Sequence, residues 1–526
     1  MRGAITTWIR CFLFVWSSLL FFSCADEPIG EADKPNILFI LSDDHTSQAW
    51  GIYGGVLHDY VQNQNIQRLA NDGAVLENAF CTNSICTPSR GSILTGQYSH
   101  TNQVYTLNEP IPAGHPNIAK TFKEHGYQTA VIGKWHLVEQ PEGFDYFNVL
   151  PGQGQYWNPI LKTKENWKDG WDGTSGKQYE GFSTDVITEL TINHLKKRDS
   201  TKPFMMFCNF KATHEPFDYP SRFASLYEND TIPEPASLLD FGKETTGRSF
   251  KGQVLEKLGE RWQKATDTEN FWTSYPGLPY PLYGLDSVQK RKKIYQKLVK
   301  DFMRCGAAID DNIGKLLDYL QDEGIAENTI VIYTADQGYF LGEHGFFDKR
   351  LIYEESLRMP FVIRYPKEIK GGQRIDDIIL NIDFSALLAD YAGIPKPDYI
   401  QGDSFRANLN GNTAKDWRRQ MYYRYWLHSP DRPAHFGIRN ERYKLAFFYG
   451  QDLGKKGTSK ETTLPNWEFY DLEEDPKELR NAINEGKYEA IIADMKIQLK
   501  KERKKYADDD ADYPVMRDIL AKAMLD

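Results

Sequence analysis

The chain has 526 residues, which is more than one ordinary hydrophobic core supports, so two domains are expected. Hydrophobic residues make up 40% of it and charged residues 26%, as in soluble globular proteins. Because 63 Lys and Arg stand against 73 Asp and Glu, the formal net charge is -10, and nucleic acid is not an expected partner. A polyanionic substrate would have to be attracted by a local basic cleft.

The N-terminus has the pattern of a targeting segment. Arg2 and Arg10 flank a short polar start, and the apolar stretch that follows, 11–22, is too short to span a bilayer securely. The stretch is followed by Cys24 and then by acidic residues, which resembles a bacterial lipoprotein signal with Cys24 as the lipidated residue. Cleavage as a plain signal peptide stays open, because bulky phenylalanines precede the cysteine. Both interpretations predict export, with a signal peptide over 1–24 and a tether over 25–35. The lipoprotein interpretation adds a lipid anchor in the membrane and places the protein in the periplasm or on the outer-membrane surface.

Strands and helices alternate through the next part of the chain. The continuous apolar run 36–41 is typical of a strand that is buried on both faces of a parallel sheet. Further elements are expected as helices over 66–73, with a glycine cap, over 118–125, capped by Gly126, and over 304–323, and as strands over 129–132, 204–210 and 329–334. This order predicts an α/β fold with a central, largely parallel sheet flanked by helices.

Two regions depart from this alternation. Between 219 and 301 the pattern breaks down into Pro-rich and aromatic stretches, which predicts a long insertion over the sheet. A second unit begins near 415, where three strands are expected over 435–439, 443–446 and 467–472. We therefore expect a catalytic domain over 36–414 and a C-terminal α+β subdomain with an antiparallel sheet over 415–526.

Polar residues follow several of the predicted strands directly. Asp43 and Asp44 come after the first strand, and Asp336 and Gln337 come after the strand 329–334. An Asp-Asp pair on its own is more often a turn or a helix cap. Ligands in open α/β sheets nevertheless gather beyond the carboxyl ends of strands. Three carboxylates and an amide oxygen there would form a site for Ca²⁺, with Mg²⁺ as the second choice.

The segment from Cys86 to Gly96 reads C-T-P-S-R-G-S-I-L-T-G. A lone cysteine beside a turn is normally a buried thiol. This segment, however, resembles the signature C-x-P-S-R-x-x-x-x-T-G of the type I, formylglycine-dependent sulfatases. The resemblance extends over 35–481 and includes G-K-W-H at 133–136 and the pattern Y-D-L-x-x-D-P-x-E-x-x-N at 470–481.

The resemblance implies a fold similar to alkaline phosphatase and a set of catalytic groups. Cys86 would be oxidised by a maturation enzyme to formylglycine (3-oxoalanine), whose hydrate attacks sulfur. Calcium would be held by Asp43, Asp44, Asp336 and Gln337 together with the modified Cys86. Arg90 would hold the formylglycine.

Further roles follow from the same resemblance. Lys134 and Lys349 would bind the sulfate oxygens, and His136 would be the base in sulfate elimination. His214 would be the general acid that protonates the leaving group. Taken alone, each of these side chains in a polar loop would be read as solvated.

The expected substrate is a sulfated polysaccharide or oligosaccharide. The stretch 336–360 resembles exported bacterial polysaccharide sulfatases and N-acetylglucosamine-6-sulfatase-like enzymes, so ulvan-like polysaccharides, slightly preferred, and glycosaminoglycans are both open. Polar residues in the loops that could read the sugar are His100, Arg350, Glu354, His428 and His435. Each has an alternative structural role; Glu354, for example, could pair with Arg358 across one helical turn.

Two other functions stay open from the sequence. A phosphonate or phosphodiester hydrolase of the same superfamily would share the nucleophile and the metal. A non-catalytic glycan-binding lipoprotein would have lost part of the site, and none of it is missing. The remaining cysteines, Cys81, Cys208 and Cys305, have neither metal-like spacing nor an even count, so a disulfide scaffold is not expected.

Overall fold

The computed structural model describes residues 34–173, 175–240, 250–265, 274–508, 510 and 512–524. Its centre is an eight-stranded sheet with the order β14-β2-β13-β9-β1-β8-β4-β5. The strands are β1 (Asn36–Ser42), β2 (Ala74–Leu76), β4 (Gln128–Lys134), β5 (Tyr146–Leu150), β8 (Phe204–Asn209), β9 (Thr329–Ala335), β13 (Phe361–Arg364) and β14 (Gln373–Ile375). β1 pairs in parallel with β8 and β9, whereas β13 runs antiparallel to β9 and β2, so the sheet is mixed and mostly parallel.

Strand β1 shows why this sheet lies in the interior. Phe39 and Leu41 pack into one hydrophobic core, and Leu38 and Ile40 pack into a second one on the opposite face. Successive side chains of a strand point to opposite faces, so a continuous apolar run needs cover on both sides. The predicted doubly buried strand is confirmed.

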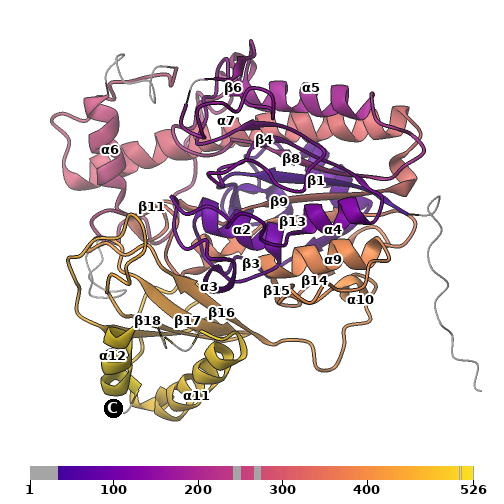
Figure 1. Ribbon diagram of the computed structural model, residues 1–526. Coiled ribbons are helices and arrows are strands. Elements are labelled where there is room, and N and C mark those ends of the chain that lie inside the picture. The colour runs from indigo at the N-terminus through magenta and orange to yellow at the C-terminus, as the bar shows by residue number, and fades with distance from the viewer. Residues whose placement is uncertain are drawn as a thin grey trace, which may run out of the picture.

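Helices cover both faces of the sheet (Figure 1). On one face lie α2 (Cys86–Thr95), α4 (Ile118–Glu124) and α9 (Phe384–Tyr391), and on the other lie α1 (Gln64–Asn71), α5 (Ser183–Leu195) and α7 (Ser287–Asp322). The predicted α/β architecture is therefore confirmed. Shorter elements complete the domain: α3 (Ser99–Asn102), α8 (Glu354–Leu357), α10 (Arg406–Leu409), β3 (Ala79–Phe80), β6 (Ile160–Leu161), β7 (Lys177–Gln178), β10 (Phe340–Leu341), β11 (Phe347–Asp348), β12 (Arg358–Met359) and β15 (Ile379–Leu380).

Two helix predictions need correction. Helix α1 ends at Asn71, and Gly73 does not adopt a left-handed cap conformation; a Cβ there would lie 2.0 Å from the Ile363 carbonyl oxygen, so close strand packing requires this glycine. Helix α7 begins at Ser287, inside the predicted insertion, where Asp286 and Gln289 form a capping box. Its first turns are rich in lysine and arginine, which hides the helical periodicity. The insertion also contains α6 (Leu255–Lys264).

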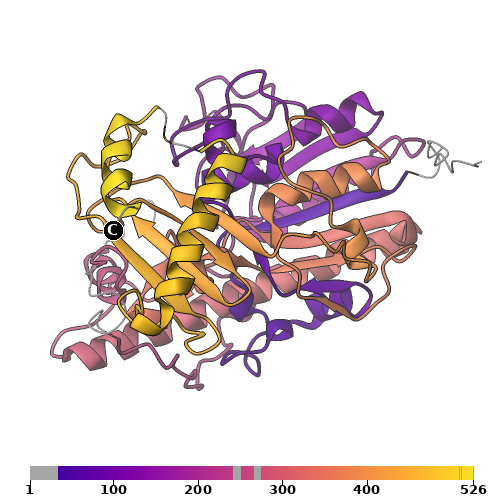
Figure 2. The same ribbon diagram turned by 90° about the horizontal axis from the view of Figure 1, so that it is seen from below.

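The C-terminal part forms a four-stranded antiparallel sheet of β16 (Gln420–Tyr425), β17 (His435–Asn440), β18 (Tyr443–Phe448) and β19 (Asn466–Asp471). The three predicted strands are present, and β16 is an additional one. Helices α11 (Glu489–Lys505) and α12 (Pro514–Met524) lie against this sheet on the side away from the main sheet (Figure 2).

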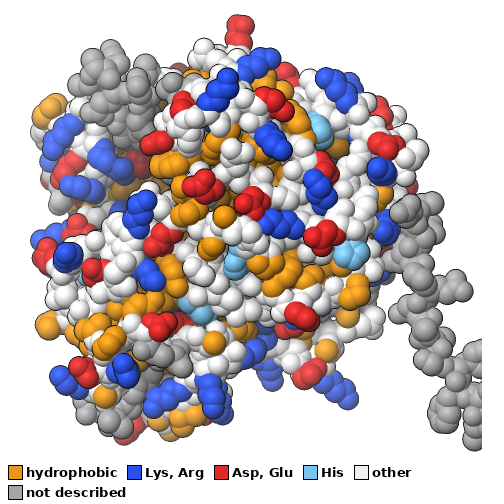
Figure 3. Space-filling view, in the orientation of Figure 1, with side chains coloured by type: hydrophobic (Ala, Val, Ile, Leu, Met, Phe, Trp, Pro, Cys, Tyr) orange, Lys and Arg blue, Asp and Glu red, His pale blue; other side chains and the backbone are white. Residues whose placement is uncertain are grey.

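Acidic and basic side chains are interspersed over the surface seen in Figure 3, without a large area of one sign. Among the described residues, no helix combines the length and the apolar character needed to cross a bilayer. The predicted signal peptide and Cys24 lie outside the described residues.

Candidate active site

Four strands of the main sheet bring their carboxyl ends to the same edge. Leu41 of β1 is in register with Asn209 of β8 and with Thr334 of β9, and Gly133 of β4 is in register with Asn209. Because parallel strands end together, the residues that follow them meet above this edge. The predicted catalytic and metal-binding side chains gather there.

Three buried carboxylates form the centre of the cluster. Asp43, Asp44 and Asp336 can each offer an oxygen atom, and these atoms lie within 4.8 Å of one another. The backbone N–H of Asp44 donates to Asp336 Oδ1 over 3.0 Å. Burial, together with the negative charge of Asp43, raises the pKa of Asp336 to about 8. Like charges held this close need a cation to be stable as carboxylates.

This set of residues fits a divalent metal ion. Asp43 Oδ1 and Gln337 Oε1 are buried and have no hydrogen-bond partner in the described part of the chain. Buried polar atoms are rarely left unpaired unless a ligand takes them. Carboxylate and amide oxygens are also the hard ligands that Ca²⁺ and Mg²⁺ prefer.

Cys86 is the first residue of α2 and lies beside this cluster. Its Sγ is 3.9 Å from Asp44 Oδ1 and 3.7 Å from Gln337 Nε2. Burial, followed by the charge of Asp43, raises the pKa of the Cys86 thiol well above its usual range. An unmodified thiol at this position is therefore protonated and a weak nucleophile.

Arg90 connects α2 to the strand ends. Its Nε donates to Asp336 Oδ2 over 2.9 Å, and its Nη2 lies 3.5 Å from Asp43 Oδ1. Its Nη1 donates to the Lys134 carbonyl over 2.9 Å. Because Arg90 lies one helical turn after Cys86, these contacts fix the first turn of α2 against the acidic cluster.

Two lysines approach the cluster from different segments. Lys134, at the end of β4, forms an ion pair with Asp43 and donates to Gln153 Oε1 over 2.6 Å. Lys349 Nζ lies 2.5 Å from Asp44 Oδ2. Both ammonium groups are buried, so they present fixed positive charge next to Cys86.

Two histidines complete the group. His214 follows β8, and its Nε2 lies 3.8 Å from Asp44 Oδ2. His136 follows β4 and has a positive φ of 54°. The His136 carbonyl accepts a hydrogen bond of 2.8 Å from Thr87 Oγ1, which places this histidine against the first turn of α2.

A cleft of about 360 Å³ opens above the cluster. Asp44, His214, Lys349 and Arg350, all predicted from the sequence, line it. The other lining residues were not predicted, and among them are the polar side chains Gln153, Lys257, Arg261, Asp348, Asp431 and Arg432. Asp348 adjoins the lysine motif and could have been suspected, whereas Lys257, Arg261 and Arg432 come from the insertion and from the β16–β17 loop, which carry no motif.

Four residues predicted to bind substrate are not among those that line the cleft. Glu354 is instead an ion-pair centre, with Arg358 at 2.8 Å, Lys444 at 3.0 Å and Arg439 at 3.1 Å. The alternative structural role for Glu354 is thus the one observed. His100 contacts the Tyr506 carbonyl through Nε2 at 2.7 Å and stacks on Tyr98.

The other two are core histidines of the C-terminal sheet region. His428 Nε2 lies 2.8 Å from the Glu461 carbonyl, and His435 stacks on Phe448 with ring centroids 4.4 Å apart. Both side chains are fully buried. Because both rings lie in the interior, their positions do not support substrate contact. Polar residues near loops often form hydrogen bonds with buried carbonyl groups instead.

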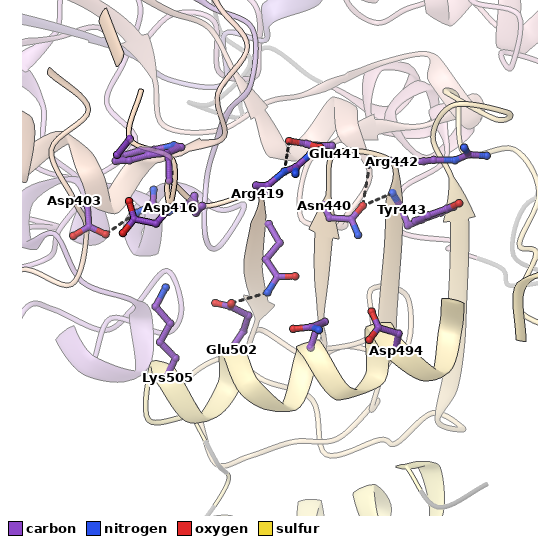
Figure 4. Close-up of a pocket in the computed structure, with 15 residues that line it drawn as sticks. Asp403, Asp416, Arg419, Asn440, Glu441, Arg442, Tyr443, Asp494, Glu502 and Lys505 are labelled. Atoms are coloured by element: carbon purple, nitrogen blue, oxygen red, sulfur yellow. Dashed lines mark hydrogen bonds and ion pairs between the residues drawn. The ribbon is translucent and has the colours of Figure 1, made fainter. Parts of the chain in front are cut away.

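A second cavity, of about 1000 Å³, lies between α11 and the segment before β16 (Figure 4). Its acidic and basic side chains contact one another: Arg419 lies 2.5 Å from Glu441, and Gln420 donates to Glu502 over 2.7 Å. None of the predicted catalytic or metal-binding residues lines this cavity. The candidate chemistry is therefore at the strand ends.

Comparisons with known proteins cover nearly the whole chain. The profile of the family described as Sulfatase matches residues 35–394, and that described as N-sulphoglucosamine sulphohydrolase, C-terminal, matches 342–505. An N-acetylglucosamine-6-O-sulfatase of Bacteroides thetaiotaomicron is 36% identical over 93% of this chain and 90% of its own. An ulvan-active sulfatase of Formosa agariphila is 25% identical over 94% of this chain and 86% of its own.

Solved structures show the same fold. One, a protein in complex with its substrate D-glucosamine-2-N,6-O-disulfate, superposes with a TM-score of 0.82 at 34% identity, over 91% of this chain and all of the other. A phosphonate monoester hydrolase from Silicibacter pomeroyi superposes with a TM-score of 0.69 at 20% identity, over 90% and 96% of the two chains. At that identity the second likeness concerns the fold alone.

Proposed function

The chain belongs to the sulfatase family, and from that premise we propose that it hydrolyses the 6-O-sulfate ester of a glucosamine unit in a sulfated glycan. The observation that carries this proposal is the 36% identity to an N-acetylglucosamine-6-O-sulfatase over 93% of the chain. The complete acid, lysine and histidine cluster around Cys86 supports it. The same relative favours a glucosamine-containing glycan over an ulvan-like one, since the ulvan-active sulfatase is only 25% identical.

Two groups would be added to the chain before it acts. Calcium, with magnesium as the second choice, would be held by Asp43, Asp44, Asp336 and Gln337 and would supply Lewis-acid stabilisation of negative charge. Formylglycine made from Cys86 by a maturation enzyme would supply the nucleophile, in place of a thiol that burial keeps protonated.

The chain's own side chains would then bind the ester and move protons. Lys134 and Lys349 would neutralise the sulfuryl oxygens, since their buried ammonium groups contact Asp43 and Asp44, the carboxylates beside Cys86. His214 would protonate the leaving oxygen. Burial, followed by the charge of Lys134, holds the pKa of His214 low, and an anionic ester between the lysines would reduce that effect. His136 would accept a proton at position 86, and Arg90 would orient that residue.

The proposal extends to where the protein works. Export, with a lipid anchor on Cys24, would place the enzyme in the periplasm or on the outer-membrane surface of a bacterium. The partners would be the sulfated glycan and the maturation enzyme, with no nucleic acid involved.

The test is sulfate release from N-acetylglucosamine 6-sulfate by protein produced together with a maturation enzyme. We expect turnover, and we expect mass spectrometry of the peptide with residue 86 to show an aldehyde in place of the thiol. Cys86→Ala should abolish turnover. Cys208→Ala, which removes a buried thiol of β8 outside the site, should retain it. Activity that survives in Cys86→Ala would contradict the mechanism.

The same preparation separates the phosphonate and phosphodiester hydrolase alternative. The kcat/KM for an aryl sulfate is compared with that for an aryl phosphonate monoester that has the same leaving group. We expect a larger kcat/KM for the sulfate ester; the opposite order would assign the site to phosphorus chemistry.

A further inference from the structure

Arg432 holds a fixed position in the wall of the cleft. It lies between β16 and β17, and its Nε donates to Gln253 Oε1 over 2.8 Å while its Nη2 donates to the Gly252 carbonyl over 2.5 Å. Gln253 is fully buried and also donates from Nε2 to the Lys349 carbonyl over 2.9 Å. A buried glutamine thus fixes Arg432 relative to the segment that carries the sulfate-binding Lys349. Such a side chain is preorganised, and little conformational entropy is lost when it binds a ligand.

Positive charge around Arg432 exceeds the carboxylate that it contacts. Asp348 is shared by three cations: Arg350 at 2.9 Å, Arg432 at 3.0 Å and Lys349 at 3.7 Å. Burial lowers the pKa of Arg432, and the nearby cations Arg350 and Arg261 add to this effect against the charge of Asp348. Lys349 is already paired with Asp44 at 2.5 Å, but Arg350 and Arg432 share the single carboxylate of Asp348, so one positive charge is left in excess and the group attracts a further anion.

The other charges of the cleft do not remove this excess. Glu215 is paired with Arg261 at 3.0 Å, and Asp44 belongs to the acidic cluster beneath. Asp431 is exposed at the rim, where water screens its charge. The anion-attracting wall is therefore formed by Arg432 and Arg350, whose side chains are 21% and 16% exposed and so can be reached from the cleft.

The wall lies next to the position of the ester that would be cleaved. Lys349 contacts both Asp44, in the acidic cluster, at 2.5 Å, and Asp348, in the wall, at 3.7 Å. All of these side chains line one cavity of about 360 Å³, which is within the usual size range of small-molecule sites. One sugar can therefore contact Lys349 and Arg432 at the same time.

We propose that Arg432, assisted by Arg350, is a second anion subsite that binds an acidic substituent other than the sulfate being hydrolysed. The inference rests on the proposed function and narrows its substrate to a glycan with at least two negative charges near the cleaved ester. The shared chemistry is an oxyanion, either a sulfate on the same sugar or a carboxylate on its neighbour. A planar guanidinium in a fixed orientation suits both, because it can donate two parallel hydrogen bonds.

The test measures binding to the Cys86→Ala protein by calorimetry with three ligands. They are N-acetylglucosamine 6-sulfate, glucosamine 2-N,6-O-disulfate, and a disaccharide of a uronic acid with N-acetylglucosamine 6-sulfate. We expect at least one of the two dianionic ligands to bind about tenfold more tightly than the monosulfated sugar, the effect of roughly one charge-assisted hydrogen bond. Tighter binding of the disulfate would indicate that the subsite binds a sulfate on the same sugar. Tighter binding of the disaccharide would indicate that it binds the carboxylate of the neighbouring sugar.

Arg432→Gln should bring that affinity ratio close to one, and Arg432→Lys should restore part of it. The matched control is Arg419→Gln, because Arg419 is an exposed arginine that lines the cavity next to α11 rather than the cleft; it should leave the ratio unchanged. The proposal is overturned if the parent protein shows no preference for a dianionic ligand. It is also overturned if Arg432→Gln weakens all three ligands by the same factor, which would indicate a structural role. Sulfate release by the matured enzyme is scored separately, so a failure of the proposed function shows as absent turnover with all three ligands, whatever the binding ratio.

Discussion

Asp43 and Asp44 are neighbours in the chain, yet each contacts a different lysine. Asp43 pairs with Lys134 from the end of β4, and Asp44, at a positive φ of 64°, pairs with Lys349. The sequence could predict both aspartates, because a buried strand ends directly before them. It could not predict which lysine each one contacts, since that depends on a backbone turn and on loops far apart in the chain.

A metal-binding prediction follows from these residues. Added Ca²⁺ should stabilise the folded protein against unfolding, by about 2.7 kcal/mol at a free concentration of 100 times the dissociation constant. Asp336→Asn should reduce this gain, because it removes one of the three clustered carboxylates. Thermal unfolding with chelator and with calcium measures the effect. Asp494→Asn, in an exposed position on α11, is the control, and an equal calcium response in all three proteins would contradict the site.

The limits of residue-level prediction are clearest for the histidines. His136 and His214 follow strands of the sheet and reach the cluster, whereas His100, His428 and His435 satisfy carbonyl groups or stack on rings. All five are polar residues near loops in the sequence. A position just after a predicted strand therefore indicates that a histidine reaches the cluster, whereas the residue type alone does not.

At the scale of elements, β4 and β8 approach each other closely at Gly133. This residue has a φ of 103°, and a Cβ there would lie 1.9 Å from the Asn209 carbonyl oxygen. The Asn209 side chain in turn donates to the Lys134 carbonyl over 3.0 Å. The glycine thus lets two strands meet at the point where Lys134, at the end of β4, pairs with Asp43 of the acidic cluster.

Gly133→Ala should therefore destabilise the fold by at least about 2 kcal/mol, since it adds both steric overlap and an unfavourable φ. It should also lower kcat/KM, because the position of Lys134 depends on the same contact. Denaturant unfolding and sulfate release measure the two effects. Gly486→Ala is the matched control, as a Cβ there meets nothing within 4 Å. Equal stability of the two variants would argue against close packing at Gly133.

An element can be predicted from the sequence where its hydrophobic pattern is strong. The buried strands β1, β8 and β9 have continuous apolar runs and were located to within a residue or two. The sequence pattern does not indicate strand β16, and it predicts a start for α7 that lies after the observed one at Ser287. In both cases charged and aromatic residues contact a neighbouring element, so the pattern reflects tertiary packing that a single sequence does not show.

At the scale of the whole molecule, the two predicted domains share one hydrophobic core. Phe39 of β1, Ile93 of α2 and Phe436 of β17 belong to the same cluster of buried residues. Arg350 of the cleft also donates to Tyr425 Oη of β16 over 3.3 Å. The boundary at 415 stays a prediction about sequence organisation, and the packing across it is continuous.

We therefore expect the protein to unfold in one cooperative transition, with equal calorimetric and van't Hoff enthalpies. A chain that ends at residue 414 should fail to fold, because the face of the main domain that packs on β17 would be exposed. Scanning calorimetry and circular dichroism measure these outcomes. Two separate transitions, or a folded truncated chain, would show that the parts are independent.

Cys86 is 1% exposed, and every residue of α2 is buried. Another enzyme cannot reach this side chain once the helix has packed against the sheet. The proposed oxidation must therefore take place on the nascent or unfolded chain, and a molecule that folds too early keeps its thiol permanently. The fraction of active enzyme in a cell would then be set by a competition between two rates, that of maturation and that of folding, rather than by the stability of the finished protein.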